Sequence, residues 1–196
     1  MTSDEITEKL IEFRKKQLLI TKRWNETGNR ELIQFITEFL PASLNAERCG
    51  VFLLNPDNQK IWIVSGTYLT ERMLLASLDG SIVGQVIQTG KAIERKDLEN
   101  QVGAHNIAGV KTGFESRNIL CVPVENSAGD KVIGAIQLLN KRGGAFEQKD
   151  YQTLETLASL LRENLEEIYE RQKLVTMLEE VEKHIQRLEV LASKVG

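Results

Sequence analysis

Two apolar strand patterns joined by a turn, with a very long helical pattern directly after them, constrain the fold of this chain more than any other feature. The strand patterns run from Asn118 to Glu125 and from Lys131 to Leu139, and the residues between them are typical turn formers. Both runs are almost continuously apolar, which predicts burial on both faces or against helices. We therefore expect this hairpin to form the centre of a sheet.

The long helical pattern begins near Phe146 and contains no Pro or Gly before Gly196. If wholly helical, it spans ~75 Å at ~1.5 Å per residue. Its first part can cover the sheet with Leu154, Leu157, Leu161, Leu165 and Ile168. Its second part steps by four and three, as in a coiled coil, through Leu174, Leu178, Val181, Ile185, Leu188, Ala192 and Val195. One small domain cannot bury this seam, so the pattern predicts a partner helix.

The N-terminal residues form another helical pattern. Thr2 and Glu5 fit a capping box, and the apolar positions after them recur with the spacing of a helix that packs along another helix. A second helix follows, which Pro41 should kink or end, because proline lacks an N–H and disfavours α geometry in the residue before it. This second helix is expected to carry an apolar face made of Leu32, Phe35, Ile36, Phe39 and Leu40.

The middle of the chain predicts shorter elements. These are a hairpin (Glu47–Leu54 and Lys60–Ser65), a short helix bounded by glycines (Gly80–Gly90), an edge strand (Ala92–Arg95) and a loop (97–113). Residues 66–79 fit either a short helix or a loop. This order of strands and helices indicates an α+β fold.

Four segments with this order of elements resemble the GAF domain family, and most of all the GAF domains of cyclic-nucleotide phosphodiesterases and adenylate cyclases. The segments are AERCGVFLLN at 46–55, SIVGQVIQTGKAI at 81–93, TGFESRNILCVPVEN at 112–126 and VIGAIQLLNK at 132–141. The resemblance implies a central antiparallel sheet of about six strands with helices on both faces. Together with the helical patterns at the two ends, it divides the chain into an N-terminal dimerisation helix (1–28), a GAF domain (29–168) and a C-terminal coiled-coil helix (169–196).

The end of the second hairpin resembles a family signature. Asn140, Lys141, Phe146 and Asp150 match it, and Tyr151 replaces its final Glu. The resemblance implies an ion pair between Lys141 and Asp150 that braces the domain beside a ligand pocket. Alternatively, the pair only fastens the strand end to the last helix. If partly exposed, it is worth less than ~1 kcal/mol.

The resemblance also implies a ligand site. Its positions are Ile82, Val83, Thr112, Ser116 and Gln137, and cyclic AMP or cyclic GMP would be the ligand. Hydroxyls, an amide and helix N–H groups are chemically adequate to hold a cyclic phosphate. Other positions depart from the ligand-binding members, which carry hydroxyl, aromatic or acidic side chains at the places of Gly50, Ser65, Gly66 and Gly109.

Several function classes are disfavoured. A net charge of −3 argues against a nucleic-acid surface. The charged N-terminus lacks the apolar core of a signal peptide, and no apolar run approaches the ~20 residues that cross a bilayer. We therefore expect a cytoplasmic protein with neither a nucleic-acid partner nor a membrane segment.

Enzymatic and metal-binding functions also lack a motif. His105 and His184 are far apart in the sequence, and no Cys or His spacing matches a metal site. Cys49 and Cys121 lie inside apolar strand patterns, which favours buried free thiols over a disulfide. We expect no enzyme and no bound metal.

Two functions remain. In the first, the chain is a regulatory GAF-type sensory module that binds a small ligand and signals through paired helices to a separate, unidentified signalling protein. In the second, it is a ligand-free dimerisation or protein-interaction module with a degenerate pocket. Both include a homodimer formed by the terminal helices, for which the heptad spacing predicts a parallel pairing.

Overall fold

The computed structural model describes residues 29–55, 59–69, 75–98 and 113–192. The helices and strands of these residues lie in the order α2 (Asn29–Ser43), β1 (Arg48–Leu54), β2 (Lys60–Gly66), β3 (Leu75–Ser77), α3 (Ile82–Thr89), β4 (Ile93–Arg95), β5 (Ile119–Glu125), β6 (Val132–Leu139) and α5 (Gln148–Ala192). The expected N-terminal helix at 1–28 lies outside the described residues.

The strands form one antiparallel sheet of six, in the order β3-β2-β1-β6-β5-β4. The hairpin predicted to be central is made by β5 and β6, and β6 also pairs with β1 along most of its length. The edge strand expected near residue 93 is β4. Part of the ambiguous stretch 66–79 is neither helix nor loop, because Leu75–Ser77 pairs with β2 as the other edge strand.

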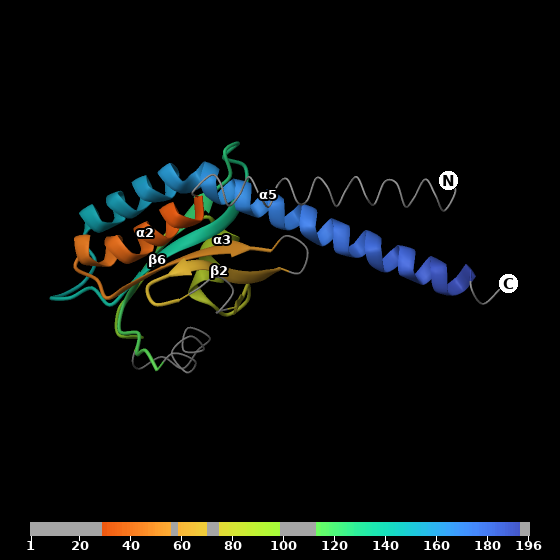
Figure 1. Ribbon diagram of the computed structural model, residues 1–196. Coiled ribbons are helices and arrows are strands. Elements are labelled where there is room, and N and C mark those ends of the chain that lie inside the picture. Colours follow the sequence, from red (N-terminus) through yellow and green to blue (C-terminus); the bar gives the residue numbers. More distant parts are fainter. Residues whose placement is uncertain (1–28, 56–58, 70–74, 99–112, 193–196) are drawn as a thin grey trace.

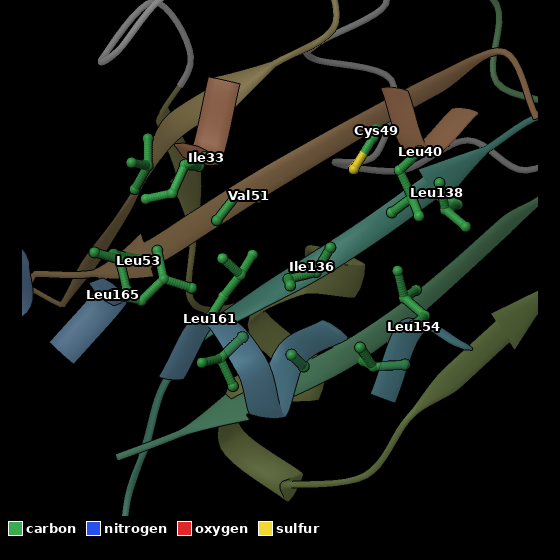
Figure 2. Close-up of a cluster of buried hydrophobic side chains, with 14 of the residues drawn as sticks. Ile33, Leu40, Cys49, Val51, Leu53, Ile136, Leu138, Leu154, Leu161 and Leu165 are labelled. Atoms are coloured by element: carbon green, nitrogen blue, oxygen red, sulfur yellow. The ribbon is translucent and has the colours of Figure 1, made fainter. Parts of the chain in front are cut away.

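Helices cover both faces of the sheet, as expected. On one face, α2 lies over β1 and β2 while α5 lies over β5 and β6 (Figure 1). Figure 2 shows Val51, Leu53 and Ile136 of the sheet packed among the helix residues Leu161 and Leu165. On the other face, α3 packs on a second apolar cluster that includes Phe52, Ile61, Ile63, Cys121 and Ala135.

The face of α2 that packs on the sheet differs from the expected one. Ile33, Thr37 and Leu40 are buried, whereas Phe35 and Phe39 are 61% and 58% exposed. The hydrophobic pattern did not reveal this rotation because one position of the buried face is a threonine. The Thr37 hydroxyl donates to the Gln34 carbonyl at 2.9 Å and contacts another hydroxyl, so its burial is compensated.

The short helix predicted between two glycines is present as α3. The Ser81 hydroxyl accepts a hydrogen bond from the Gly84 N–H at 2.9 Å and so caps the helix start, while Gly90 ends the helix with a φ of 66°. Gly84 is needed for close packing, because a Cβ there would lie 2.0 Å from the Leu78 carbonyl oxygen.

Helix α5 packs on the sheet only along its first part. Leu154, Leu161, Leu165 and Ile168 are buried there, and beyond Tyr169 the helix continues past the sheet (Figure 1). On this distal part Leu174, Met177 and Val181 are 40%, 52% and 46% exposed. Among the described residues, no helix is long and apolar enough to cross a membrane.

Candidate functional site

The α3 face of the sheet holds most of the expected ligand positions. Ile82 and Val83 begin α3, and their side chains are buried in the apolar cluster of this face. Their backbone N–H groups lie in the first turn of α3, where N–H groups have no acceptor inside the helix. Ser116 is half-buried just before β5. Thr112 lies outside the described residues.

Gln137 lies in the middle of the sheet on this face. It is directly opposite Gly50 of β1 and Cys121 of β5. Its side chain is half-buried, and within the described part of the chain its amide has no hydrogen-bond partner. A half-buried amide without a partner is uncommon in a folded protein and marks a place where a ligand or water can bind.

The space above Gly50 is filled by an aromatic ring. A Cβ at Gly50 would lie 2.8 Å from Cε2 of Phe52 and 3.5 Å from Nε2 of Gln137. Phe52 is only 4% exposed, so its ring is a fixed part of the α3 face. A ligand on this face would therefore meet an aromatic edge at the position where ligand-binding members carry a hydroxyl.

Ser65 does not face the α3 side, although the resemblance compares it with a purine contact. The pairing of β1 with β2 shifts register next to Val51, and Ser65 lies opposite Val51, which packs against the helices. Its hydroxyl lies 2.8 Å from the Thr37 hydroxyl, and Thr67 donates to the Thr37 carbonyl at 2.7 Å. This polar group attaches β2 to α2.

The expected ion pair joins three elements at the end of the sheet. Lys141 Nζ lies 2.9 Å from Asp150 Oδ1 and donates to the Leu44 carbonyl at 2.8 Å. The other oxygen of Asp150 accepts from the Glu147 N–H at 2.8 Å. The side chains of Lys141 and Asp150 are 11% and 0% exposed. The pair is therefore largely buried, and losing one partner leaves a buried charge, which costs about 3–5 kcal/mol.

Asn140 organises the neighbouring chain segments. It is fully buried with a φ of 57°, and its oxygen accepts from the Arg117 N–H at 2.7 Å. Its NH₂ donates to the Glu115 carbonyl and to Glu47, and Glu47 also pairs with the Arg117 side chain. Burial acts to raise the pKa of Glu47, but the bonds from Asn140 and Arg117 outweigh it, so this pKa lies below its usual value. No pattern in the sequence indicated that Glu47 and Arg117 would belong to this cluster.

Phe146, the remaining signature residue, is 6% exposed in the cluster of the helix-covered face.

The cysteines are buried free thiols on opposite faces of the sheet, as expected. Burial raises the pKa of Cys49 to about 12 and the pKa of Cys121 further. Since the thiolate is the nucleophile, neither is set up for thiol chemistry. His184 is exposed on α5 with Nδ1 2.9 Å from the Glu180 carbonyl, and His105 lies outside the described residues. No cluster of His, Cys, Asp and Glu suited to a metal occurs within 29–55, 59–69, 75–98 and 113–192.

Comparisons with known proteins agree with this fold. The dual 3',5'-cyclic-AMP and -GMP phosphodiesterase 11A of Takifugu rubripes is 26% identical over 144 residues, which are 67% of this chain and 16% of that protein. The corresponding phosphodiesterase 11 of Drosophila melanogaster is 27% identical over 136 residues, or 61% of this chain and 9% of that protein. The chain thus spans less than a fifth of the length of these relatives.

A solved GAF domain from a phosphoenolpyruvate-protein phosphotransferase of Coxiella burnetii has a TM-score of 0.61 at 17% identity, covering 80% of this chain and 94% of that structure. At this identity the likeness concerns the fold alone. The family model described as GAF domain matches residues 29–165. The chain therefore belongs to the GAF domain family, whose members are in general regulatory and sensory modules.

Proposed function

We propose that this GAF domain is a sensory module that binds a small ligand on the α3 face of its sheet and signals through α5. One observation supports this most strongly. Helix α5 packs on β5 and β6 through Leu154, Leu161 and Leu165, and the opposite face of these strands holds Gln137 and Cys121. Because packed interiors resist compression, a shift of these strands on ligand binding would move the helix as a unit.

Cyclic AMP and cyclic GMP are the first ligands to test. Relatives named as dual cyclic-AMP and cyclic-GMP phosphodiesterases support this choice, as do the first turn of α3 and the Gln137 amide. The Phe52 ring above Gly50 and the rotation of Ser65 toward α2 remove two contacts that such ligands use in similar domains. Other small metabolites therefore belong in the same screen.

A thermal-shift screen tests ligand binding. A ligand that binds only the native state at 100 times its Kd stabilises it by about 2.7 kcal/mol, which corresponds to a rise in Tm of roughly 5–10 °C for a chain of this size. The Gln137→Leu variant should reduce that rise, whereas Thr153→Val, an exposed change on α5, should leave it unchanged. A flat response to cyclic AMP and cyclic GMP removes these two ligands from the proposal.

A ligand-free dimerisation module is the second proposal. The Phe52 ring that fills the space above Gly50 favours it, because a filled site leaves less room for a ligand. If the chain is such a module, it should form a stable dimer, and no compound in the screen should raise the Tm of the wild-type chain. Under this proposal, Gln137→Leu would leave every measured property of the dimer unchanged.

In both proposals the chain is a homodimer with an unidentified signalling partner. The exposed apolar side chains Leu174, Met177 and Val181 on distal α5 support a helical interface. The proposed parts remain 1–28, 29–168 and 169–196, with pairing through the first and last. Two buried free thiols support a reducing, cytoplasmic location.

Analytical ultracentrifugation tests the dimer. Leu174→Asp combined with Val181→Asp should give a monomer whose globular part keeps its Tm, since neither side chain packs in the domain core. Glu170→Asp, an exposed change on the same helix, serves as the control. Unchanged association of the double variant would exclude this stretch of α5 as the interface.

A further inference from the structure

Arg48 is a half-buried cation at the start of β1, on the same face of the sheet as α3. Its position follows from the alternation of the strand, since Phe52 on that face belongs to the α3 cluster and Cys49, Val51 and Leu53 belong to the opposite cluster. It lies opposite Leu139 of β6, which packs against the α3 cluster. Gly50 and Gln137 come next along the same row.

Two aromatic rings hold the guanidinium group. Its carbon lies 3.8 Å from the ring centre of Phe114 and 5.9 Å from that of Tyr68. Cation–π contacts engage the flat face of a guanidinium and leave its N–H edges available. Burial lowers the pKa of Arg48, but an arginine side chain keeps its positive charge at neutral pH.

No oxygen within the described part of the chain accepts a hydrogen bond from the Arg48 side chain, and no carboxylate there pairs with it. The contrast with Arg117 is direct, because Arg117 pairs with Glu47. A half-buried guanidinium normally satisfies its donors, so N–H edges without an acceptor among the described residues indicate a site for an external acceptor.

Tyr68 supplies an independent observation. It follows β2 with a φ of 63°, and its side chain is 86% exposed. A bulky residue with positive φ is strained, and such strain is found preferentially at ligand clamps and active sites. Neighbouring contacts hold this conformation, namely the hydrogen bond from the Leu69 N–H to the Gly66 carbonyl and the short bridge between these residues.

We propose that Arg48, stacked on Phe114 and facing Tyr68, binds the anionic group of the sensed ligand. That group is a carboxylate or a phosphate, because both accept two parallel hydrogen bonds from a guanidinium edge. The inference rests on the proposed sensory function. It adds a ligand class, which is a small organic anion whose uncharged part lies toward Gln137.

The experiment observes Arg48 directly. In NMR spectra of the full chain, the Nε–Hε signal that is missing from Arg48→Lys is the Arg48 signal. Titration with sodium phosphate and, separately, with sodium acetate at constant ionic strength should move it saturably, with a Kd of about 1–10 mM for the better anion. The Arg142 signal serves as the control, because Arg142 is exposed on the loop between β6 and α5.

Variants separate binding from packing. Arg48→Met keeps an apolar stem for the two rings and should abolish the phosphate-dependent rise in Tm. Arg48→Lys keeps the charge but lacks the planar fork, and should weaken phosphate binding at least about threefold. If the Arg48 signal does not saturate, or if it moves no further than that of Arg142, the inference is wrong.

Its failure is distinguishable from failure of the proposed function. Adenosine and cyclic AMP differ by the phosphate, so a rise in Tm with cyclic AMP alone that disappears in Arg48→Met supports the inference. A ligand that stabilises wild type and Arg48→Met equally overturns the inference and leaves the sensory function standing. Saturation by phosphate without any stabilising organic ligand supports the anion site and contradicts the sensory function.

Discussion

The two faces of the sheet differ in how the polar side chains near their centres are bonded. On the face covered by α2 and α5, the hydroxyls of Thr37, Ser65 and Thr67 bond one another or the backbone, and at its edge Lys141 and Asp150 have close partners. On the α3 face, the Gln137 amide and the Arg48 guanidinium have no hydrogen-bond partner within the described residues. The first face fastens its hydroxyls and its ion pair within the fold, although Arg162 Nε and Glu94 Oε1 on the α5 side have no hydrogen-bond partner among the described residues. The second face presents an amide and a guanidinium that suit a ligand.

The largest expected effect concerns the satisfied face. Asp150→Ala leaves Lys141 buried without its carboxylate and should lower the free energy of unfolding by about 3–5 kcal/mol, measured by urea denaturation. Lys149→Ala removes the partner of an exposed pair, Lys149 with Glu147, and should cost less than about 1 kcal/mol. Equal losses in the two variants would contradict the difference in burial.

The cluster of Thr37, Ser65 and Thr67 between α2 and β2 is expected to contribute less to the free energy of unfolding than the ion pair. Thr37→Val leaves the Ser65 hydroxyl without its partner and should cost about 1–3 kcal/mol. Thr156→Val removes a hydroxyl that bonds the Gln152 carbonyl on the exposed side of α5, and it serves as the control. Adding Ser65→Ala to Thr37→Val should recover part of the loss, and a strictly additive result would show that the two hydroxyls do not interact.

Acid should weaken the cluster around Asn140 by a smaller amount. The folded-state pKa of Glu47 lies below its unfolded value near 4.5, so its contribution is fully present above that value and is lost as the pH falls through the folded pKa. The carboxylate is partly exposed, so the effect should stay below about 1 kcal/mol. Urea denaturation of wild type and Glu47→Gln between pH 3 and 6 measures it, and curves of identical shape would contradict the assignment.

The smallest effect on stability is expected on the α3 face. Gln137→Leu removes an amide that has no hydrogen-bond partner among the described residues, so the free energy of unfolding should change by less than about 1 kcal/mol in either direction. A loss similar to that of Thr37→Val would show that Gln137 is bonded in solution, which would weaken the contrast between the two faces.

The central hairpin, the short helix and the long helix were predictable because each has a dense local pattern. The side of α2 that packs on the sheet was not predictable. A buried threonine interrupts the apolar face that packs there, and Phe35 and Phe39 make an exposed face look like a buried one in the sequence. The orientation of Ser65 depends on a register shift between β1 and β2, and neither strand's sequence contains a pattern that predicts this shift.

The candidate site was predictable only as a set of positions. The resemblance placed Ile82, Val83 and Gln137 in the site, and the structure places them on one face of the sheet. It gave no sign of Arg48, whose ring partners come from two other parts of the chain, at 68 and 114. Contacts between such distant residues depend on the whole fold, so a local pattern cannot reveal them.

The most direct test of a ligand site on the α3 face is one thermal-shift experiment on two proteins, wild type and the double variant Gln137→Leu with Arg48→Met. Both would be screened against cyclic AMP, cyclic GMP and small phosphorylated or carboxylated metabolites. We expect at least one compound to raise the Tm of wild type by roughly 5–10 °C near 100 times its Kd and to leave the double variant unchanged. A flat response in wild type, or equal rises in both proteins, would contradict a ligand site on this face.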